Sequence, residues 1–237
     1  MGKVYIVPEA MRYEAAFLAQ QRAANLCATD GNPRLFILEH PHVVTIGRDA
    51  KPEDRKMSDA QLETRGIDVF DLRKSHYNRG GSFTYHGPGM MMGYTITLAN
   101  DGEVRRRHIE MLEHATISVM LANGINVFGN YNSKHPGVLV SATKEKIAAI
   151  GVGFPKVRGV RVSMHGVAVY VNPQLEYFDM IHACGDKDAR VTSMEKKIKE
   201  VPPMDVIMKQ FLEAYSKVTG ITFSREQVTP TLEEAVQ

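Results

Sequence analysis

The sequence predicts an α+β fold in which a mixed β-sheet is flanked by helices. Three segments carry the 3.6-residue apolar period of amphipathic helices, and seven short runs of β-forming residues lie between them. Long helices interspersed with strands are typical of sandwiches of sheet and helix. No internal repeat, low-complexity linker or break in composition divides the chain. We therefore expect residues 1–237 to form one domain.

Each predicted helix combines an apolar stripe with a glycine just beyond its end. The first stripe follows 4-3-4-3 spacing from Tyr13 to Cys27, which places its residues on one helix face. Glycine is common after the last helical turn because it adopts the left-handed conformation at little cost. The first predicted helix runs from about residue 13 to near Gly31, the second from about 104 to 122 before Gly124, and the third from about 204 to Gly220.

The seven predicted strands are short runs rich in Val, Ile and Leu. They cover residues 35–39, 43–46, 67–72, 93–98, 138–142, 146–152 and 166–172. The fifth and sixth runs are joined by residues 143–145, a polar connection of hairpin length. Because strand side chains alternate between faces, we expect Lys146 to share a face with Ala148 and Ile150.

Composition and charge narrow the classes of function. The formal net charge is +2, so we expect no nucleic-acid partner, which would require a concentrated basic face. The basic run Arg105–Arg107 is either a solvated helix face or a docking patch for an acidic partner. We find no signal-peptide pattern and no apolar stretch of the ~18 residues that a membrane helix needs. We therefore expect a protein that does not bind membranes. The chain has only two cysteines and no disulfide framework, so we expect it in the cytoplasm.

A glycine-rich segment of unusual composition is the strongest local sign of a binding site. Residues 78–94 read NRGGSFTYHGPGMMMGY, with aromatic rings, methionines and a histidine among the glycines. The segment lacks the spacing of phosphate-binding loops, and Pro88 removes an amide donor that such a loop would use. It is either a wide turn whose aromatic side chains cover a sheet or a loop whose backbone approaches a ligand. The second interpretation predicts an apolar wall made by Phe83, Tyr85 and Met90–Met92.

The two cysteines differ as candidate nucleophiles. Cys27 lies on the apolar face of the first helix, where a thiol is normally inert. Cys184 lies in HACGDKDAR, where a following glycine and nearby charges would allow exposure and a stabilised thiolate. Its proton could be taken by His182, two residues upstream, or by Lys146 at the start of an apolar strand. Spacing alone does not decide between these bases, and no His or Cys cluster has the spacing of a tetrahedral metal site.

Six blocks of the sequence are informative as an ordered set. They are ILEHPHVVTIGRDA (37–50), RGGSFTYHGPG (79–89), KIAAIGV (146–152), SMHGVAVYVN (163–172), YFDMIHACG (177–185) and VTSM (191–194). In order and approximate spacing, over about residues 10–215, they resemble the octanoyltransferase family, also called lipoate-protein ligase B. The second block is highly specific. Two positions depart from the usual pattern, since Met90 stands where the family commonly has Gln and Ala183 where it commonly has Pro.

The resemblance implies a fold and an activity. The family has the catalytic fold of biotin- and lipoate-protein ligases, a mixed sheet flanked by helices. It moves an octanoyl group from the phosphopantetheine arm of acyl carrier protein to one lysine of a lipoyl domain. The acceptors are E2 subunits of 2-oxoacid dehydrogenases and the glycine cleavage H protein. Because the group passes through a cysteine thioester, we expect neither ATP nor a metal as cofactor. Separately, we expect the protein to be a monomer.

The functional residues of the family fall on definite positions of this chain. Cys184 matches the acyl-accepting cysteine, and Lys146 matches the lysine that assists it. Backbone amides around Gly151 and Gly166 are expected to stabilise the oxyanion, each donor contributing about 3 kcal/mol. The residues expected to contact the acyl group are Arg79, Gly80, Gly81, Ser82, Phe83, Thr84, Tyr85, His86, Ala149, Ile150, Gly151, His165, Gly166, Val167 and Ala168.

Two other functions stay open on the sequence alone. An ATP-dependent lipoate or biotin ligase of the same fold would activate a free acid as an adenylate and would not need Cys184. A non-catalytic protein that binds acyl groups or their carriers would keep the pocket without the reaction.

Overall fold

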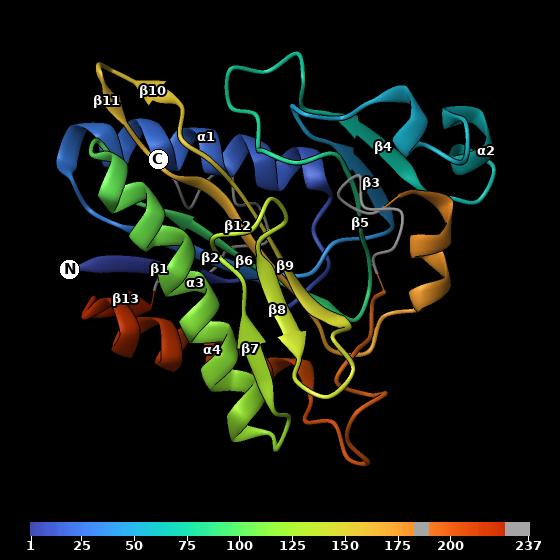
Figure 1. Cartoon of the computed structure of the whole chain (residues 1–237). Helices are drawn as coiled ribbons and strands as arrows, with labels where there is room; N and C mark the ends of the chain where they lie inside the picture. Colours follow the sequence, from blue (N-terminus) through green and yellow to red (C-terminus); the bar gives the residue numbers. More distant parts are fainter. Residues whose placement is uncertain (183–189, 226–237) are drawn as a thin grey trace.

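The computed structural model describes residues 1–182 and 190–225, which form sheets surrounded by helices (Figure 1). Cys184 therefore lies outside the described residues. In chain order the elements are β1 (Gly2–Ile6), α1 (Tyr13–Asp30), β2 (Arg34–Leu38), β3 (Val43–Ile46), the 3₁₀ turn η1 (Pro52–Asp54), α2 (Asp59–Glu63), β4 (Asp68–Asp71), β5 (Phe83–His86), β6 (Met90–Ile96), α3 (Gly102–Ala122), β7 (Val127–Gly129), β8 (Gly137–Val140), β9 (Lys146–Gly153), β10 (Lys156–Val157), β11 (Val160–Arg161), β12 (Met164–Tyr170), the 3₁₀ turn η2 (Leu175–Met180), α4 (Met204–Thr219) and β13 (Phe223–Arg225).

An eight-stranded mixed sheet forms the centre of the described structure. Its strand order is β13-β1-β2-β6-β12-β9-β8-β7. β1 pairs in parallel with β2 and β13, whereas the other neighbours in the sheet pair antiparallel. A three-stranded sheet in the order β4-β3-β5 and the short β10-β11 ladder accompany it. The predicted α+β class with a mixed sheet is therefore confirmed.

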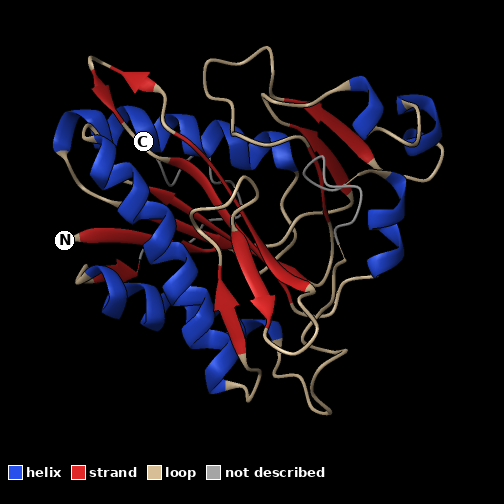
Figure 2. Ribbon diagram, in the orientation of Figure 1, coloured by secondary structure: helices blue, strands red, loops and turns tan. Residues whose placement is uncertain are grey.

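Helices cover both faces of the large sheet, as the blue and red elements of Figure 2 show. α3 and α4 pack against each other on one face, where they share a core with Leu35, Met91 and Val167. α1 packs on the opposite face, in a second core with Phe36 and Met92 and with side chains of the small sheet. Neighbouring residues of β2 and of β6 enter opposite cores because strand side chains alternate.

The three long helices lie where the sequence predicts them. Gly31, Gly124 and Gly220, which follow them, have φ angles of 71°, 77° and 70°, so each adopts the left-handed conformation expected at a helix end. None of the helices in the described part of the chain combines the length and the apolar composition that a membrane crossing needs.

The glycine-rich segment is not one continuous loop, so that prediction is wrong. Residues 83–86 form β5, residues 90–96 form β6, and residues 87–89 make the turn between them. β5 pairs antiparallel with β3, whereas β6 lies in the middle of the large sheet, so the turn carries the chain from one sheet to the other. Local composition suggested a loop because five glycines stand in this segment, but long-range pairing decides the conformation.

A β-bulge in β9 reverses the expected orientation of Lys146. Val138 pairs with Ala148, but the next residue, Leu139, pairs with Lys146, so Ile147 is an extra residue in β9. Ile147 and Ala148 are both fully buried in the core under α3 and α4. Lys146 therefore lies on the opposite face of β9 from Ala148 and Ile150. The expectation that they share a face is wrong.

Gly166 and Gly151 face each other across β12 and β9, but the space around them differs. A Cβ on Gly166 would lie 2.0 Å from the carbonyl oxygen of Gly93 in β6, which is backbone held in the sheet. A Cβ on Gly151 would meet the Cδ of Arg79 at 3.5 Å, which is an ordinary contact.

We expect Gly166→Ala to lower the free energy of unfolding by about 3 kcal/mol, because β6 and β12 would have to separate. The matched variant Gly151→Ala should change it by less than about 1 kcal/mol, since the added methyl fits. Urea unfolding of both variants measures the difference. Equal stability of the two would contradict the close approach of β6 to β12.

Candidate functional site

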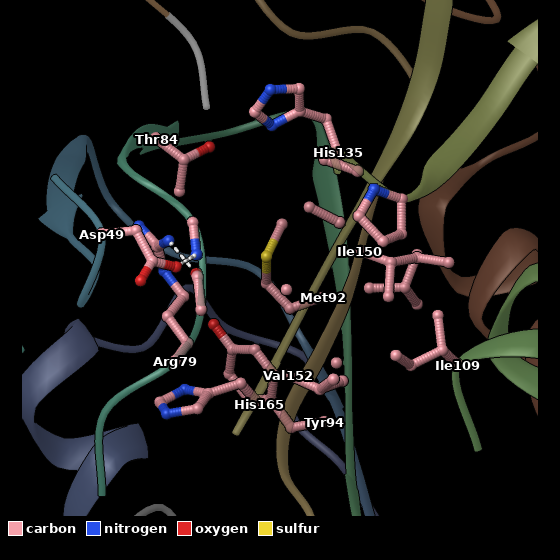
Figure 3. Close-up of a pocket in the computed structure, with 18 of the residues that line it drawn as sticks. Asp49, Arg79, Thr84, Met92, Tyr94, Ile109, His135, Ile150, Val152 and His165 are labelled. Carbon is pink, nitrogen blue, oxygen red and sulfur yellow. Dashed lines mark hydrogen bonds between the residues drawn. The ribbon is translucent and has the colours of Figure 1, made fainter. Parts of the chain in front are cut away.

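A cavity of about 310 Å³ is lined by residues of both sheets (Figure 3). Its walls come from β5, β6, β9 and β12, from residues 48–49 and 79–81, and from the β7–β8 loop, residues 130–136. Figure 3 shows Thr84 and His135 at one end of the cavity and His165 and Tyr94 at the other. This volume is within the range of sites for small organic ligands.

The structure brings most of the expected contact residues together around this cavity, although they come from three separate parts of the chain. Those that line it are Arg79, Gly80, Gly81, Thr84, His86, Ala149, Ile150, Gly151, His165, Gly166, Val167 and Ala168.

The alternation of β5 separates two of the expected residues from the cavity. Thr84 and His86 line the cavity, whereas Phe83 and Tyr85 are buried in the core shared with α1. The predicted aromatic part of the wall is therefore wrong. All three methionines are fully buried, but Met92 of β6 lines the cavity whereas Met90 and Met91 do not.

Ser82 also turns away from the cavity, toward a buried carboxylate. Its hydroxyl donates a hydrogen bond of 2.6 Å to Oδ2 of Asp54. The backbone carbonyl of Asp54 in turn accepts the N–H of His182 at 2.8 Å. Asp54 therefore ties the glycine-rich segment to the chain that leads into residues 183–189.

Buried rings form a hydrogen-bonded cluster at one end of the cavity. The hydroxyl of Tyr94 donates to Nε2 of His40 at 2.8 Å. His165 donates through Nε2 to a backbone carbonyl at 2.8 Å, which leaves Nδ1 to accept from the hydroxyl of Tyr13 at 3.5 Å. Burial lowers the pKa of both His40 and His165 to about 4, so both rings are neutral at physiological pH. This end of the cavity is polar but carries no imidazolium charge.

Arg79 and Asp49 hold the glycines beside them in place. Nη2 of Arg79 donates to the carbonyl and the hydroxyl oxygen of Thr45, at 2.9 and 2.7 Å. The carboxylate of Asp49 accepts the N–H of Gly81 at 2.8 Å. Burial acts to raise the pKa of Asp49, but this N–H and the neighbouring arginines hold it below its ordinary value. These hydrogen bonds fix the course of residues 79–81, which form part of the cavity wall.

Lys146 lies beside the cavity rather than in its wall. Its Nζ donates to the backbone carbonyl of His135, a cavity residue, at 3.0 Å. Its own N–H donates to the carbonyl of Arg190 at 2.8 Å, and its carbonyl accepts the N–H of Thr192 at 3.0 Å. Lys146 therefore joins the rim of the cavity to the chain that leaves residues 183–189. His182 and Lys146, the two candidate bases, are each tied to one end of the segment that contains Cys184.

Gly166 is not free to stabilise an oxyanion through its amide. It pairs with Gly151 of β9 on one side and with Tyr94 of β6 on the other. A residue in a strand that is paired on both sides has its N–H engaged in the sheet. The expectation that other backbone amides around Gly151 and Gly166 stabilise the oxyanion stays a prediction.

Sequence reasoning missed the β7–β8 loop and several single residues. Arg48 and Asp49 lie near the end of the first of the six sequence blocks, which was a signal that they belong to the site. The loop had no such signal, because its sequence is that of an ordinary polar connection. It reaches the cavity because β8 pairs with β9. The missed cavity residues are Tyr13, Arg48, Asp49, Tyr94, Ile109, Tyr131, Ser133, Lys134, His135, Pro136 and Val152.

Comparison with known proteins identifies the family. The model of the lipoyl protein ligase A/B catalytic domain matches residues 9–216. The chain is also 36% identical over 218 residues to the octanoyltransferase of Caldicellulosiruptor saccharolyticus, which covers 91% of this chain and 88% of that protein. The chain belongs to the octanoyltransferase family. The octanoyltransferase of Bacteroides thetaiotaomicron is 37% identical over 184 residues, 76% of each chain. The resemblance found in the sequence is confirmed, and this member of the octanoyltransferase family is an acyltransferase.

Solved structures share the fold of this octanoyltransferase-family chain. A lipoate-protein ligase A bound with ATP has a TM-score of 0.77 at 15% identity, over 99% of this chain and 92% of that chain. A bi-partite lipoate protein ligase from Thermoplasma acidophilum has a TM-score of 0.76 at 15% identity, over 99% and 90%. The predicted ligase-type fold is confirmed.

Proposed function

We propose that the protein transfers an octanoyl group from acyl carrier protein, through a thioester on Cys184, to a lysine of a lipoyl domain. The acceptors are the E2 subunits of 2-oxoacid dehydrogenases and the glycine cleavage H protein. The observation that carries the proposal is the position of Lys146, which touches the rim of a largely apolar cavity and the chain next to the segment of Cys184.

In the first half of the proposed reaction, Lys146 takes the proton of the Cys184 thiol, and the thiolate attacks the carbonyl carbon of the donor thioester. A bond forms between that carbon and the cysteine sulfur, and the bond to the phosphopantetheine sulfur breaks. The leaving thiolate receives the proton from Lys146. One thioester replaces another, so no ATP is consumed.

In the second half, the amine of the acceptor lysine attacks the acyl-enzyme. A carbon–nitrogen bond forms, the carbon–sulfur bond to Cys184 breaks, and the proton lost by the amine returns to the cysteine through Lys146. Amide formation from a thioester is downhill, which drives the transfer to completion.

The cavity supports an acyl substrate by its chemistry. Met92, Ile109, Ile150, Val152 and Val167 supply apolar surface. Burial of an eight-carbon chain yields about 0.8 kcal/mol per methylene, or roughly 5 kcal/mol before the costs of ordering. That free energy is large enough to select for chain length.

The proposal includes neither ATP nor a metal, because the donor is already activated as a thioester. We also place the reaction in the cytoplasm, since two cysteines without a disulfide framework suit a reducing compartment.

Intact-protein mass spectrometry after incubation with octanoyl-loaded acyl carrier protein tests the proposal. We expect one octanoyl adduct on Cys184 without ATP or Mg²⁺, and its discharge when a lipoyl domain is added. A requirement for ATP and free octanoate would favour a ligase instead. An acyl group that binds but forms no covalent adduct would indicate a binding protein.

A further inference from the structure

Glu113 is a buried carboxylate that lies outside the cavity wall. It belongs to α3, and its side chain is 2% exposed. Ile109, one helical turn earlier, lines the cavity, so the two side chains lie on the same face of α3. The helix thus contributes one residue to the cavity and places a carboxylate next to it.

The carboxylate of Glu113 binds the start of the β7–β8 loop. Its Oε1 accepts the backbone N–H of Asn130. The neighbouring backbone N–H of Tyr131 acts with this bond to lower the pKa of Glu113. Gly129 makes this approach possible, because a Cβ on Gly129 would lie 2.0 Å from the Cδ of Glu113. A carboxylate that accepts a backbone N–H offsets part of the cost of its burial.

The loop held in this way contacts Lys146 through His135. Tyr131 and His135 both line the cavity, and the backbone carbonyl of His135 accepts the hydrogen bond from Nζ of Lys146 at 3.0 Å. The side chain of Lys146 also runs across Gly137, the first residue of β8, where a Cβ would lie 3.3 Å from its Cε. The position of the Lys146 ammonium group therefore depends on where the loop lies.

We propose that Glu113 is a positioning residue for the transfer reaction. By accepting the N–H of Asn130 it sets the course of the β7–β8 loop, and the loop presents the His135 carbonyl that orients Nζ of Lys146. The inference rests on the proposed function, in which Lys146 moves protons at the reacting sulfur. Glu113 acts through Lys146 and does not touch the substrate.

A simple contribution to stability would not explain this arrangement. Burial of a carboxylate costs free energy, so it is an unfavourable means of fixing a loop. Burial raises the pKa of Glu113, and the N–H groups of the loop act in the opposite direction. An apolar side chain of similar volume would pack between α3 and β7 without that cost. An apolar side chain could not accept the N–H of Asn130, the hydrogen bond that fixes the start of the loop.

Four variants test the proposal. Glu113→Ala removes both acceptors, Glu113→Gln keeps an oxygen that accepts one N–H, and Gly129→Ala displaces the carboxylate without removing it. Glu110→Ala, on the same helix and half-buried, is the charge-matched control. The full-length protein is used throughout, and circular dichroism melting checks that each variant is folded.

Turnover with octanoyl-loaded acyl carrier protein and an isolated lipoyl domain gives the first measurement. We expect Glu113→Ala and Gly129→Ala to lower kcat on the order of 100-fold, as small misplacements of a catalytic group do, with KM for the lipoyl domain nearly unchanged. Glu113→Gln should recover to within about tenfold of the parent protein, since one hydrogen bond is kept. Glu110→Ala should match the parent. A loss confined to KM, or an equal loss in Glu113→Gln and Glu113→Ala, would overturn the proposal.

A measurement without substrate separates this inference from the proposed function. Lys146 is acetylated with acetic anhydride, and the rate of this acetylation is measured by mass spectrometry of the peptide that contains Lys146. In Glu113→Ala we expect that rate to rise about fivefold, because Nζ is no longer held on the His135 carbonyl, and in Glu110→Ala to stay unchanged. An unchanged rate in folded Glu113→Ala or Gly129→Ala would overturn the proposal. A raised rate together with a parent protein that transfers no octanoyl group would support the positioning and refute the proposed function.

Discussion

Replacement of Cys184 by alanine or by serine is expected to abolish octanoyl transfer while the fold is kept. In the proposed reaction the sulfur of Cys184 carries the acyl group between donor and acceptor. Alanine has no nucleophile, and a serine hydroxyl keeps its proton at neutral pH far more strongly than a thiol does. The measurement is the mass of the lipoyl domain after incubation with octanoyl-loaded carrier protein, together with the melting temperature of each variant.

The other cysteine supplies the matched control. Cys27 is fully buried in α1, and burial raises the pKa of its thiol to about 11, so it stays protonated. We expect Cys27→Ala to retain transfer. Transfer that survives in both Cys184 variants would discard the thioester route.

Lys146→Ala is expected to lower the rate of transfer by about 10²–10⁴-fold, the usual contribution of a positioned general base. The structure holds its Nζ at the rim of the cavity through the His135 carbonyl, and alanine leaves no group there that can accept or return a proton. Single-turnover kinetics of acyl-enzyme formation measure the effect directly.

Two variants control this result. Lys144→Ala removes an exposed lysine two residues away, whose Nζ lies 4.5 Å from the ring centroid of Phe128, and should leave the rate unchanged. His182→Ala should keep most of the activity. If His182→Ala loses activity and Lys146→Ala keeps it, the role of base passes to His182.

The sequence determined the helices and the family of this protein. Helix positions could be predicted because an apolar stripe and a terminal glycine are local signals, and α1, α3 and α4 lie where those signals place them. The specific block at residues 79–89, together with its order relative to the other blocks, was sufficient to indicate the family. These features depend on residue type and short spacing, which a sequence carries in full.

Only the tertiary structure decided which side chains reach the cavity. Phe83 and Tyr85 face the core because β5 pairs with β3, and Lys146 turns away from Ala148 because Ile147 is a bulge. The β7–β8 loop and its hold on Glu113 likewise depend on contacts between distant segments. A one-residue change of register sends a strand side chain to the opposite face, and register is set by partner strands that the local sequence does not specify.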